Sequence, residues 1–93
     1  MNFVWDTVKS IANLQKHRVS FEEAETVFND PLAVTVDDRQ HSEREAREII
    51  IGHSDFDRLL FISFTERSDG IRLISAREAT RQERKKYEDS ISD

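Results

Sequence analysis

Arginine side chains near the C-terminal end are the residues of this sequence best suited to chemistry. A guanidinium group presents paired N–H donors that match a phosphate or a carboxylate. A cluster of them could hold an RNA phosphodiester and stabilise the charge that develops in its transition state. The basic side chains in question are Arg67, Arg72, Arg77, Arg81, Arg84 and Lys85, with Tyr87 just beyond them.

Cleavage of RNA at such a cluster needs no metal if a ribose 2′-hydroxyl attacks the adjacent phosphate. It does need a base for the hydroxyl proton and an acid for the leaving oxygen. Glu66 and His41 are candidate bases, and Tyr87 could stack on an RNA base. The alternative is that these charged side chains are merely solvated, as most charged residues are.

Other catalytic patterns are missing from the sequence. There is no cysteine, and the three histidines, His17, His41 and His53, do not share the spacing of one helix face, so we expect no metal site. The only glycines are Gly52 and Gly70, so no glycine-rich phosphate loop is predicted. No nucleophile elbow is present. The position of His53 at the end of an expected strand favours a structural role for this histidine.

Length and charge predict a single small domain over residues 1–93, with a frayed tail at 88–93. The net charge of −5 argues against a generic nucleic-acid binder. However, residues 67–87 hold seven basic and three acidic side chains, a local excess that suits phosphates or an acidic protein. We see no membrane-spanning run and no secretory signal, so with the lack of cysteine we expect a cytoplasmic protein.

Two apolar runs, 59–66 and 71–76, predict a β-hairpin whose loop is Ser68-Asp69-Gly70. A two-residue loop at Asp69-Gly70 would set Arg67 opposite Arg72, and facing like charges are destabilising. We therefore expect a three-residue loop. The pairs that it predicts are Glu66 with Arg72, Phe64 with Ile74, and Ile62 with Ala76.

This register separates two faces of the hairpin, because side chains alternate along a strand. The expected core face carries Leu60, Ile62, Phe64, Ile74 and Ala76, with Glu66 and Arg72 at its rim. The expected outer face is half polar and carries Phe61, Ser63, Thr65, Arg67, Leu73, Ser75 and Arg77.

The remaining segments predict an α+β fold: a twisted, mainly antiparallel sheet of about five strands, with two N-terminal helices on one face. A third, C-terminal helix is expected near the polar face. The expected strands are Phe3–Trp5, Leu32–Val36 and Ile49–His53, besides the hairpin. The expected helices are Thr7–His17 after an Asp6 cap, Phe21–Asn29 after a Ser20/Glu23 capping box, and Arg81–Ser90 after a Thr80/Glu83 capping box. Residues 37–48 are almost wholly polar and predict a long loop.

An ordered set of short motifs resembles the BrnT family of bacterial type II toxins over nearly the whole chain. The motifs are Phe3-Val-Trp-Asp6, Asn13-Leu-Gln-Lys-His17, Val19-Ser-Phe-Glu-Glu-Ala24, Val27-Phe-Asn-Asp-Pro-Leu32, Glu45-Ala-Arg47, Gly52-His-Ser54, Thr65-Glu-Arg67, Ile71-Arg-Leu-Ile-Ser-Ala-Arg77, Ala79-Thr80, Glu83-Arg84 and Tyr87. One position departs from the family pattern: Arg18 stands where a glycine is expected, and in a left-handed helix cap it would be mildly strained.

The resemblance implies a RelE-like fold and a metal-independent ribonuclease, without cofactor, that halts translation. It also implies a BrnA-type antitoxin, in a hetero-oligomer that reaches operator DNA only through the antitoxin. By match to the motifs, Arg67, Arg72, Arg77 and Tyr87 are the first candidates for the active face, followed by Glu66. Candidates for RNA binding are Arg81, Arg84, Lys85 and Lys16, although Lys16 and His17 could equally be structural.

Two other classes of function stay open. The basic hairpin and helix could form a non-catalytic module that binds an acidic or amphipathic partner, in which case RNA incubated with the protein stays intact. A DNA-binding regulator is the third interpretation. No helix with base-reading residues supports it, and the chain as a whole is acidic.

Overall fold

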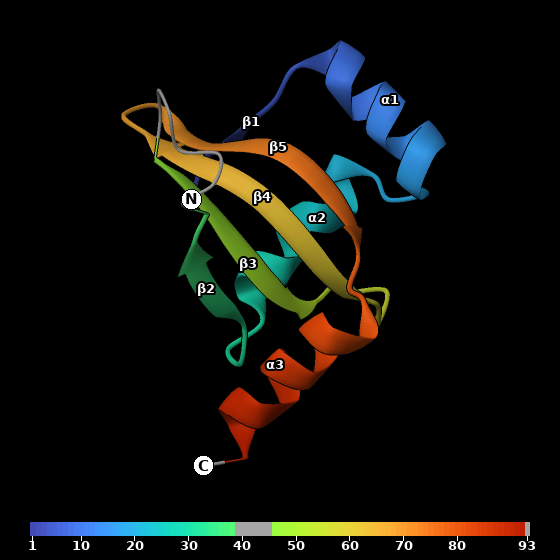
Figure 1. Cartoon of the computed structure of the whole chain (residues 1–93). Coiled ribbons are helices and arrows are strands. Elements are labelled where there is room, and N and C mark those ends of the chain that lie inside the picture. Colours follow the sequence, from blue (N-terminus) through green and yellow to red (C-terminus); the bar gives the residue numbers. More distant parts are fainter. Residues whose placement is uncertain (39–45, 93) are drawn as a thin grey trace.

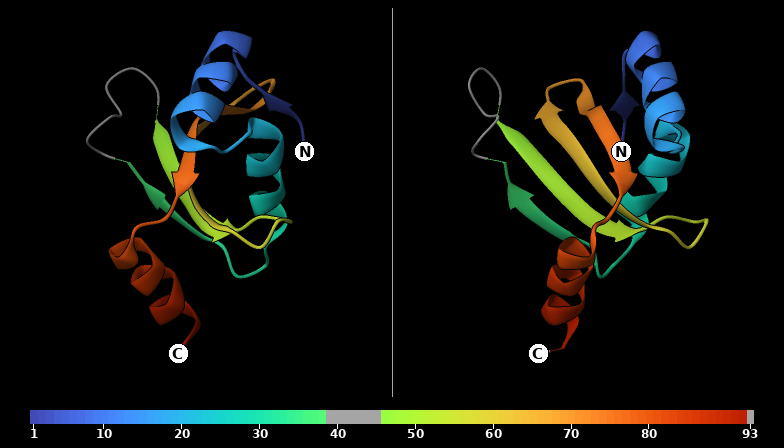
Figure 2. Two further views of the ribbon diagram at one scale, coloured as in Figure 1. Left: turned by 90° about the vertical axis from the view of Figure 1, so that its right-hand side faces the viewer. Right: turned by 45° about the vertical axis from the view of Figure 1, so that its right-hand side comes forward.

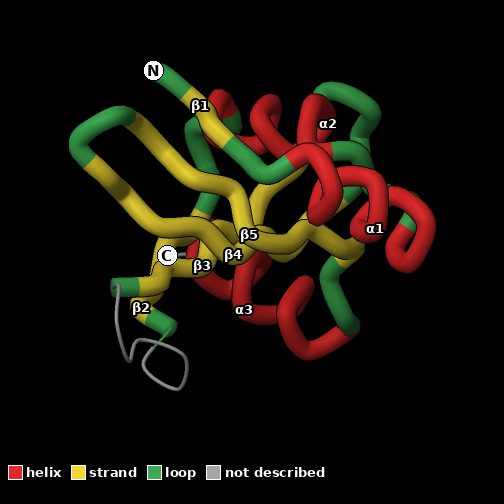
Figure 3. The backbone as a smooth tube through the Cα atoms, turned by 90° about the horizontal axis from the view of Figure 1, so that it is seen from above, coloured by secondary structure: helices red, strands yellow, loops and turns green. Residues whose placement is uncertain are grey.

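The computed structural model describes residues 1–38 and 46–92, which form one five-stranded sheet with helices on both faces (Figures 1 and 3). The strand order is β1-β5-β4-β3-β2; only the β1–β5 pair is parallel. The expected α+β fold is confirmed. The elements are β1 Phe3–Val4, α1 Thr7–His17, α2 Phe21–Thr26, the 3-10 helix η1 Val27–Asn29, β2 Val34–Asp37, β3 Arg47–His53, β4 Leu59–Arg67, β5 Gly70–Glu78 and α3 Arg81–Ile91.

The helices begin at the residues that the caps predict. The Asp6 carboxylate accepts the backbone N–H groups of Val8 and Lys9, and the Ser20 hydroxyl accepts that of Glu23. At α3, Thr80 and Glu83 form a complete capping box. Helix α1 ends at Arg18 in the left-handed conformation, with φ of 60°, as the departure from glycine predicted.

One face of the sheet, which we call the inner face, packs against α2 and η1. Its core side chains include Leu60 and Ile62 from β4 and Ala76 from β5, all fully buried. Phe21 and Val27 cover them from the helices. Helix α1 lies along β5 and contacts α2, and Figure 2 shows it on the same side of the sheet as α2.

The opposite, outer face carries a second, smaller apolar cluster beneath α3. It consists of Ile51, Leu59 and Tyr87, with Ile49 and Phe61 packed beside them. Ile49 and Ile51 therefore point outward, whereas Ile50 joins the inner core. The three consecutive isoleucines thus contribute to the apolar clusters on both faces of the sheet. The expected position of α3 near the half-polar face is confirmed.

The register of the β4–β5 hairpin differs from the prediction. Its loop has two residues, Ser68 and Asp69, so that Arg67 pairs with Gly70 and Glu66 with Ile71. The predicted pairs of Glu66 with Arg72 and of Phe64 with Ile74 are wrong, whereas Ile62 does pair with Ala76.

A β-bulge reconciles these pairings. Ser63 pairs with Ser75 while Phe64 pairs with Leu73, which leaves Ile74 as the extra residue. Beyond the bulge every side chain of β5 lies on the face opposite to the predicted one. Leu73 is thus buried in the inner core, and Arg72, paired with Thr65, lies on the outer face.

The N-terminal segment explains the shift of register. The Asn2 carbonyl accepts the N–H of Ile71, and the Asn2 side chain donates to the Asp69 carbonyl. A Cβ on Gly70, where φ is 134°, would lie 2.3 Å from the Asn2 oxygen. The hairpin end is therefore shaped by residues almost seventy positions away, which local turn rules do not include.

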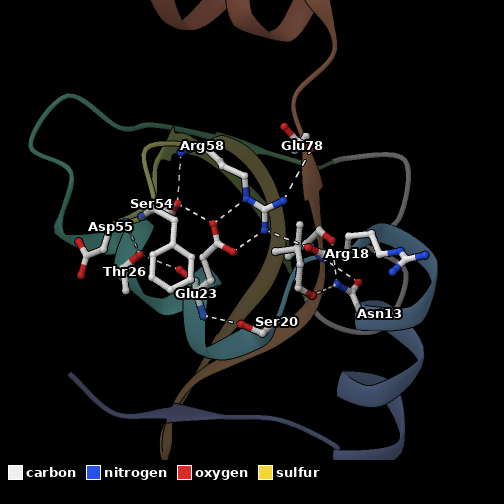
Figure 4. A network of polar contacts seen from close by, with 12 residues as sticks. Asn13, Arg18, Ser20, Glu23, Thr26, Ser54, Asp55, Arg58 and Glu78 are labelled. Carbon is white, nitrogen blue, oxygen red and sulfur yellow. Dashed lines mark hydrogen bonds and ion pairs between the residues drawn. The ribbon is translucent and has the colours of Figure 1, made fainter.

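The prediction that the Glu23 side chain completes a capping box with Ser20 is wrong. Instead of bonding back to the helix start, the Glu23 carboxylate accepts hydrogen bonds from Arg58 and from the Ser54 hydroxyl (Figure 4). Arg58 also donates to the Arg18 carbonyl, 2.9 Å away. This clamp joins the β3–β4 loop to α2 and to the end of α1.

Several boundaries of the expected elements change. The helix expected at Phe21–Asn29 is divided into α2, which ends at Thr26, and η1. The strand expected at Leu32–Val36 runs from Val34 to Asp37, and the strand expected at Ile49–His53 begins at Arg47. The predicted 37–48 loop is thus shorter at both ends. Its remaining centre, with the candidate base His41, lies outside the described residues. No helix in the described part of the chain has the length and apolarity to cross a membrane.

Candidate active site on the outer face

Arg67, Arg72 and Arg77 all lie on the outer face of the sheet. The alternation of side chains along β4 and β5 places Arg67 and Arg72 on the outer face near the hairpin turn. Arg77 lies on the same face near α3, where it pairs with Phe61. At about 3.3 Å per residue, Arg72 and Arg77 are about 16 Å apart along β5. The hairpin turn and α3 lie at opposite ends of the sheet (Figure 1). The three arginines therefore form a row rather than a cluster around one phosphate group.

Arg77 is held firmly in place at the α3 end of this row. Its Nη1 and Nη2 donate to the two carboxylate oxygens of Glu83, at 2.8 and 2.9 Å, and Nη1 also reaches the Glu78 carbonyl. The guanidinium carbon lies 4.2 Å from the centre of the Phe61 ring, a cation–π contact. Glu83 also belongs to the capping box of α3, so the start of α3 fixes this arginine.

The Arg77 guanidinium retains one edge for a ligand. Of its five N–H groups, Glu83 and Glu78 occupy three. The other two, on Nε and Nη2, lie side by side and make no hydrogen bond within the described part of the chain. Such a pair matches two oxygens of a phosphate, and the Arg77 side chain is 35 % exposed. Arg77 can thus accept an anion without losing Glu83.

Charge states at this pair are well defined. Burial opposes ionisation of Glu83, but hydrogen bonds from Arg77 and from the backbone of Thr80 outweigh burial and lower the pKa of Glu83. The hydrogen bond to Glu83 also raises the pKa of the Arg77 guanidinium. Both groups remain charged at neutral pH.

A second polar assembly joins Asp30, His53 and Tyr87 where the end of η1, the end of β3 and helix α3 meet. Tyr87, the one buried residue of α3, donates its hydroxyl to Asp30 Oδ2 at 2.8 Å. Asp30 also accepts the backbone N–H groups of His53 and of Leu32. His53 Nδ1 lies 3.2 Å from the Tyr87 oxygen, and the two rings meet edge to face.

The pKa shifts in this assembly favour a phenol and a carboxylate. Burial comes first and the hydrogen bond to Asp30 second in raising the pKa of Tyr87 to about 12. For Asp30, burial opposes ionisation, but the hydrogen bonds from His53, Leu32 and Tyr87 prevail and lower its pKa. Tyr87 therefore acts as a hydrogen-bond donor to Asp30 at neutral pH, and not as a base.

This arrangement selects one tautomer of neutral His53. Because the single hydroxyl proton of Tyr87 is given to Asp30, the contact at His53 Nδ1 requires a proton on that nitrogen. The lone pair of the neutral ring then lies on Nε2. The His53 side chain is 38 % exposed, so Nε2 is a candidate proton acceptor at the end of the outer face.

The other predicted site residues are distributed over the molecule. Glu66 takes an inner-face position of β4, opposite to the face that carries the arginine row, and it lies at the exposed hairpin end. Tyr87 is only 4 % exposed, which leaves no open ring face for an RNA base while α3 stays in place. Arg81, Arg84 and Lys85 are exposed on α3, where Lys85 pairs with Asp89. Lys16 is exposed on α1, at the other end of the molecule from α3 (Figures 1 and 2).

Asp30 and His53 are the site residues that the sequence did not reveal as a pair. They are 23 positions apart and meet only because η1 and the end of β3 pack together. The one available signal was Asp30-Pro31, which reads as a helix end but also places a carboxylate at a tight turn.

Comparisons with known proteins identify the family and the fold of this chain. The family model described as "Ribonuclease toxin, BrnT, of type II toxin-antitoxin system" matches residues 5–83. The chain is also similar in structure to the Brucella abortus ribonuclease toxin BrnT, known from a 1.1 Å crystal structure. The TM-score is 0.66 at 21 % identity, over 87 % of this chain and 99 % of that one. No curated protein matches.

The family match covers well over half of the chain and so places it in a class, the ribonuclease toxins of type II toxin–antitoxin systems. Within that class, the chain belongs to the BrnT family. The sequence resemblance is thereby confirmed, and the family implies both an RNA substrate and an antitoxin partner.

Proposed function

We propose that this toxin cuts RNA on the outer face of its sheet by attack of a ribose 2′-hydroxyl on the adjacent phosphate, without a metal ion. The supporting observation is Arg77, held by Glu83 and Phe61 with one guanidinium edge unused. In this proposal that edge binds the scissile phosphate. Because its position is set before RNA binds, it stabilises the developing charge without reorganisation.

The remaining residues of the row and of the second assembly have distinct proposed roles. Arg72 and Arg67, on the same face toward the hairpin, bind phosphates along the RNA strand. His53 Nε2 accepts the 2′-hydroxyl proton as the 2′-oxygen bonds to phosphorus. The bond from phosphorus to the 5′-oxygen then breaks, and the leaving 5′-oxygen takes a proton from water. Tyr87 and Asp30 orient the His53 ring and are positioning residues. On α3, Arg81, Arg84 and Lys85 supply positive charge beside the entering RNA.

The cellular consequences follow from the family. We propose that cleavage of RNA inhibits translation and that a BrnA-type antitoxin neutralises the toxin in a hetero-oligomer. In this proposal the antitoxin contacts operator DNA and the toxin does not, because the toxin carries a net charge of −5.

The test is cleavage of a short RNA by the purified chain in the presence of EDTA. We expect products with a 2′,3′-cyclic phosphate, detected by mass spectrometry, and no cleavage when the nucleotide 5′ to the cut carries a 2′-deoxyribose. Cleavage of the deoxy-substituted RNA, or its dependence on added metal, would refute the mechanism. RNA left intact under all conditions, by a folded protein, would instead favour a non-catalytic binding module.

A further inference from the structure

Arg47 lies on the outer face and has no role in the function proposed above. It begins β3 and pairs directly with Thr65 of β4, which pairs on its other side with Arg72 of β5. Directly paired residues point to the same face of a sheet. Ile49 and Ile51, which follow Arg47 at every second position, belong to the outer apolar cluster. Arg47 is therefore on the face that carries the arginine row.

Three arginines surround Thr65 at the hairpin end of this face. Neighbouring strands are about 4.8 Å apart, so the backbones of Arg47 and Arg72, on either side of β4, are about 10 Å apart. Arg67 is two residues beyond Thr65, about 7 Å along β4. Arginine side chains are long enough to span such gaps, so one ligand can reach all three guanidinium groups. We call Arg47, Arg67 and Arg72 the hairpin-end cluster.

The hairpin-end cluster is packed at its centre and open at its rim. Thr65 is 1 % exposed, Arg47 and Arg72 are half-buried, and Arg67 is exposed. Helix α3 lies at the other end of the sheet (Figure 1). Water and salt screen a half-buried charge less than a fully solvated one. Arg47 and Arg72 are therefore better placed to hold an anion than fully solvated arginines.

The acidic side chains of these strand ends lie on the opposite, inner face. Glu48 follows Arg47 along β3. Glu66 precedes Arg67 along β4. Because side chains alternate, both acids point inward, where Asp37 pairs with Glu48. Burial first, and then repulsion from Glu66 and Asp37, raise the pKa of Glu48. The sheet thus separates a group of carboxylates on one face from a group of guanidinium ions on the other.

We propose that the hairpin-end cluster is a second phosphate site, in which Arg47, Arg67 and Arg72 bind an internal phosphate of the RNA strand that is cut at Arg77. The inference rests on the proposed function. It adds Arg47 to the RNA-binding residues and requires a substrate with more than one phosphate. An acidic segment of a protein also suits three arginines. RNA is favoured because the unused edge of Arg77 lies on the same face, about 16 Å away along β5.

The first measurement compares two substrates of the variant Arg47→Gln. A dinucleoside monophosphate has one phosphate, so it cannot bind at Arg77 and at the hairpin-end cluster together. We expect Arg47→Gln to raise the KM of a longer RNA about tenfold with little change in kcat, because one charge-assisted contact is lost. Cleavage of the dinucleoside monophosphate should be unchanged. The matched control is Arg18→Gln, which removes the same charge from an exposed position at the end of α1 and should alter neither substrate.

The second measurement is binding, which does not depend on cleavage. The probe is the all-deoxy strand of the same sequence, which keeps its phosphates but lacks the attacking 2′-hydroxyl. Its Kd, measured by fluorescence anisotropy, should rise about tenfold in Arg47→Gln at low salt and by less at high salt. Arg47→Lys keeps the charge and the long side chain but lacks paired donors, so it should raise the Kd by a smaller factor. It replaces Arg47→Gln if circular dichroism shows that variant to be unfolded.

Four results would overturn the inference. They are an unchanged Kd in both Arg47 variants, an equal loss in Arg18→Gln, an equal loss of cleavage for the dinucleoside monophosphate, and weaker binding of the antitoxin with unchanged binding of the strand. If the wild type cuts no RNA while Arg47→Gln still weakens binding of the deoxy strand, the proposed function fails and the second phosphate site stands. If the wild type cuts RNA and Arg47→Gln has no effect, the proposed function stands and this inference fails.

Discussion

Two arginine–glutamate pairs in this molecule have the same chemistry and opposite surroundings. Arg58–Glu23 lies on the α2 side, where the Glu23 side chain is 3 % exposed, and it binds a loop to two helices. Arg77–Glu83 lies on the outer face, with side chains 35 % and 20 % exposed. The comparison shows that an ion pair alone does not reveal the role of an arginine. Burial, and the donors left unused, distinguish the structural clamp at Arg58 from the proposed ligand site at Arg77.

The Arg58 clamp should give the largest loss of stability. Arg58→Ala leaves the Glu23 carboxylate buried with only Ser54 as side-chain partner, and breaking a buried pair costs about 3–5 kcal/mol. The free energy of unfolding in urea measures it. Replacing both partners by apolar residues, as Glu23→Leu with Arg58→Met, should recover at least half of the loss. A double variant no more stable than Arg58→Ala would show that the charges themselves are required.

The Arg77 pair should matter much less for stability. Arg77→Gln removes a half-exposed ion pair and a cation–π contact, together worth about 1 kcal/mol. The same urea experiment compares it directly with Arg58→Ala. If Arg77→Gln destabilises the protein as much as Arg58→Ala does, Arg77 is part of the structural framework and the distinction between the two pairs is lost.

Loss of the Tyr87 hydroxyl should have a modest effect on stability and a selective effect on catalysis. Tyr87→Phe keeps the ring in the apolar cluster and removes its hydrogen bond to Asp30, at a cost of about 1–2 kcal/mol. The neutral His53 ring is then free to change tautomer. We expect cleavage to slow about tenfold through the maximal rate, with little change in KM. A rise in KM alone, measured in initial-rate assays, would assign Tyr87 to RNA binding instead.

Acid should weaken the Arg58–Glu23 clamp. The hydrogen bond from Arg58 holds the pKa of Glu23 below its ordinary value of 4.5, despite burial. A lowered folded-state pKa contributes stability above pH 4.5, and this contribution disappears as the pH falls through the folded pKa. Unfolding curves of wild type should thus lose more stability below pH 4.5 than those of Glu23→Gln. Parallel losses in the two proteins would contradict this assignment.

Much of the fold follows from local sequence patterns, and the exceptions come from distant contacts. The helix starts at Asp6, Ser20 and Thr80 are local events, so the caps predict them correctly. The hairpin register is not local. Asn2 shapes the backbone around Gly70, and a bulge at Ile74 turns Arg72 outward. No rule for turns or facing charges contains those contacts.

The candidate site was predictable in part for the same reason. Arg67 and Arg77 have the predicted orientation because alternation along a strand is a local property. Arg72 reached the outer face only through the bulge. The pairing of Glu83 with Arg77, and that of Asp30 with His53, depends on how α3 and η1 pack on the sheet. Residue types identified the donors, but only the fold identifies their partners.

The central claim is that the arginine row on the outer face cuts RNA, and the variant Arg72→Gln/Arg77→Gln tests it most directly. The measurement is the single-turnover rate on one short RNA, with circular dichroism as the check on folding. We predict a rate at least about 100-fold below that of wild type, because the scissile phosphate loses the Arg77 donors and a neighbouring phosphate loses Arg72. A folded double variant that cuts RNA at the wild-type rate would contradict the account.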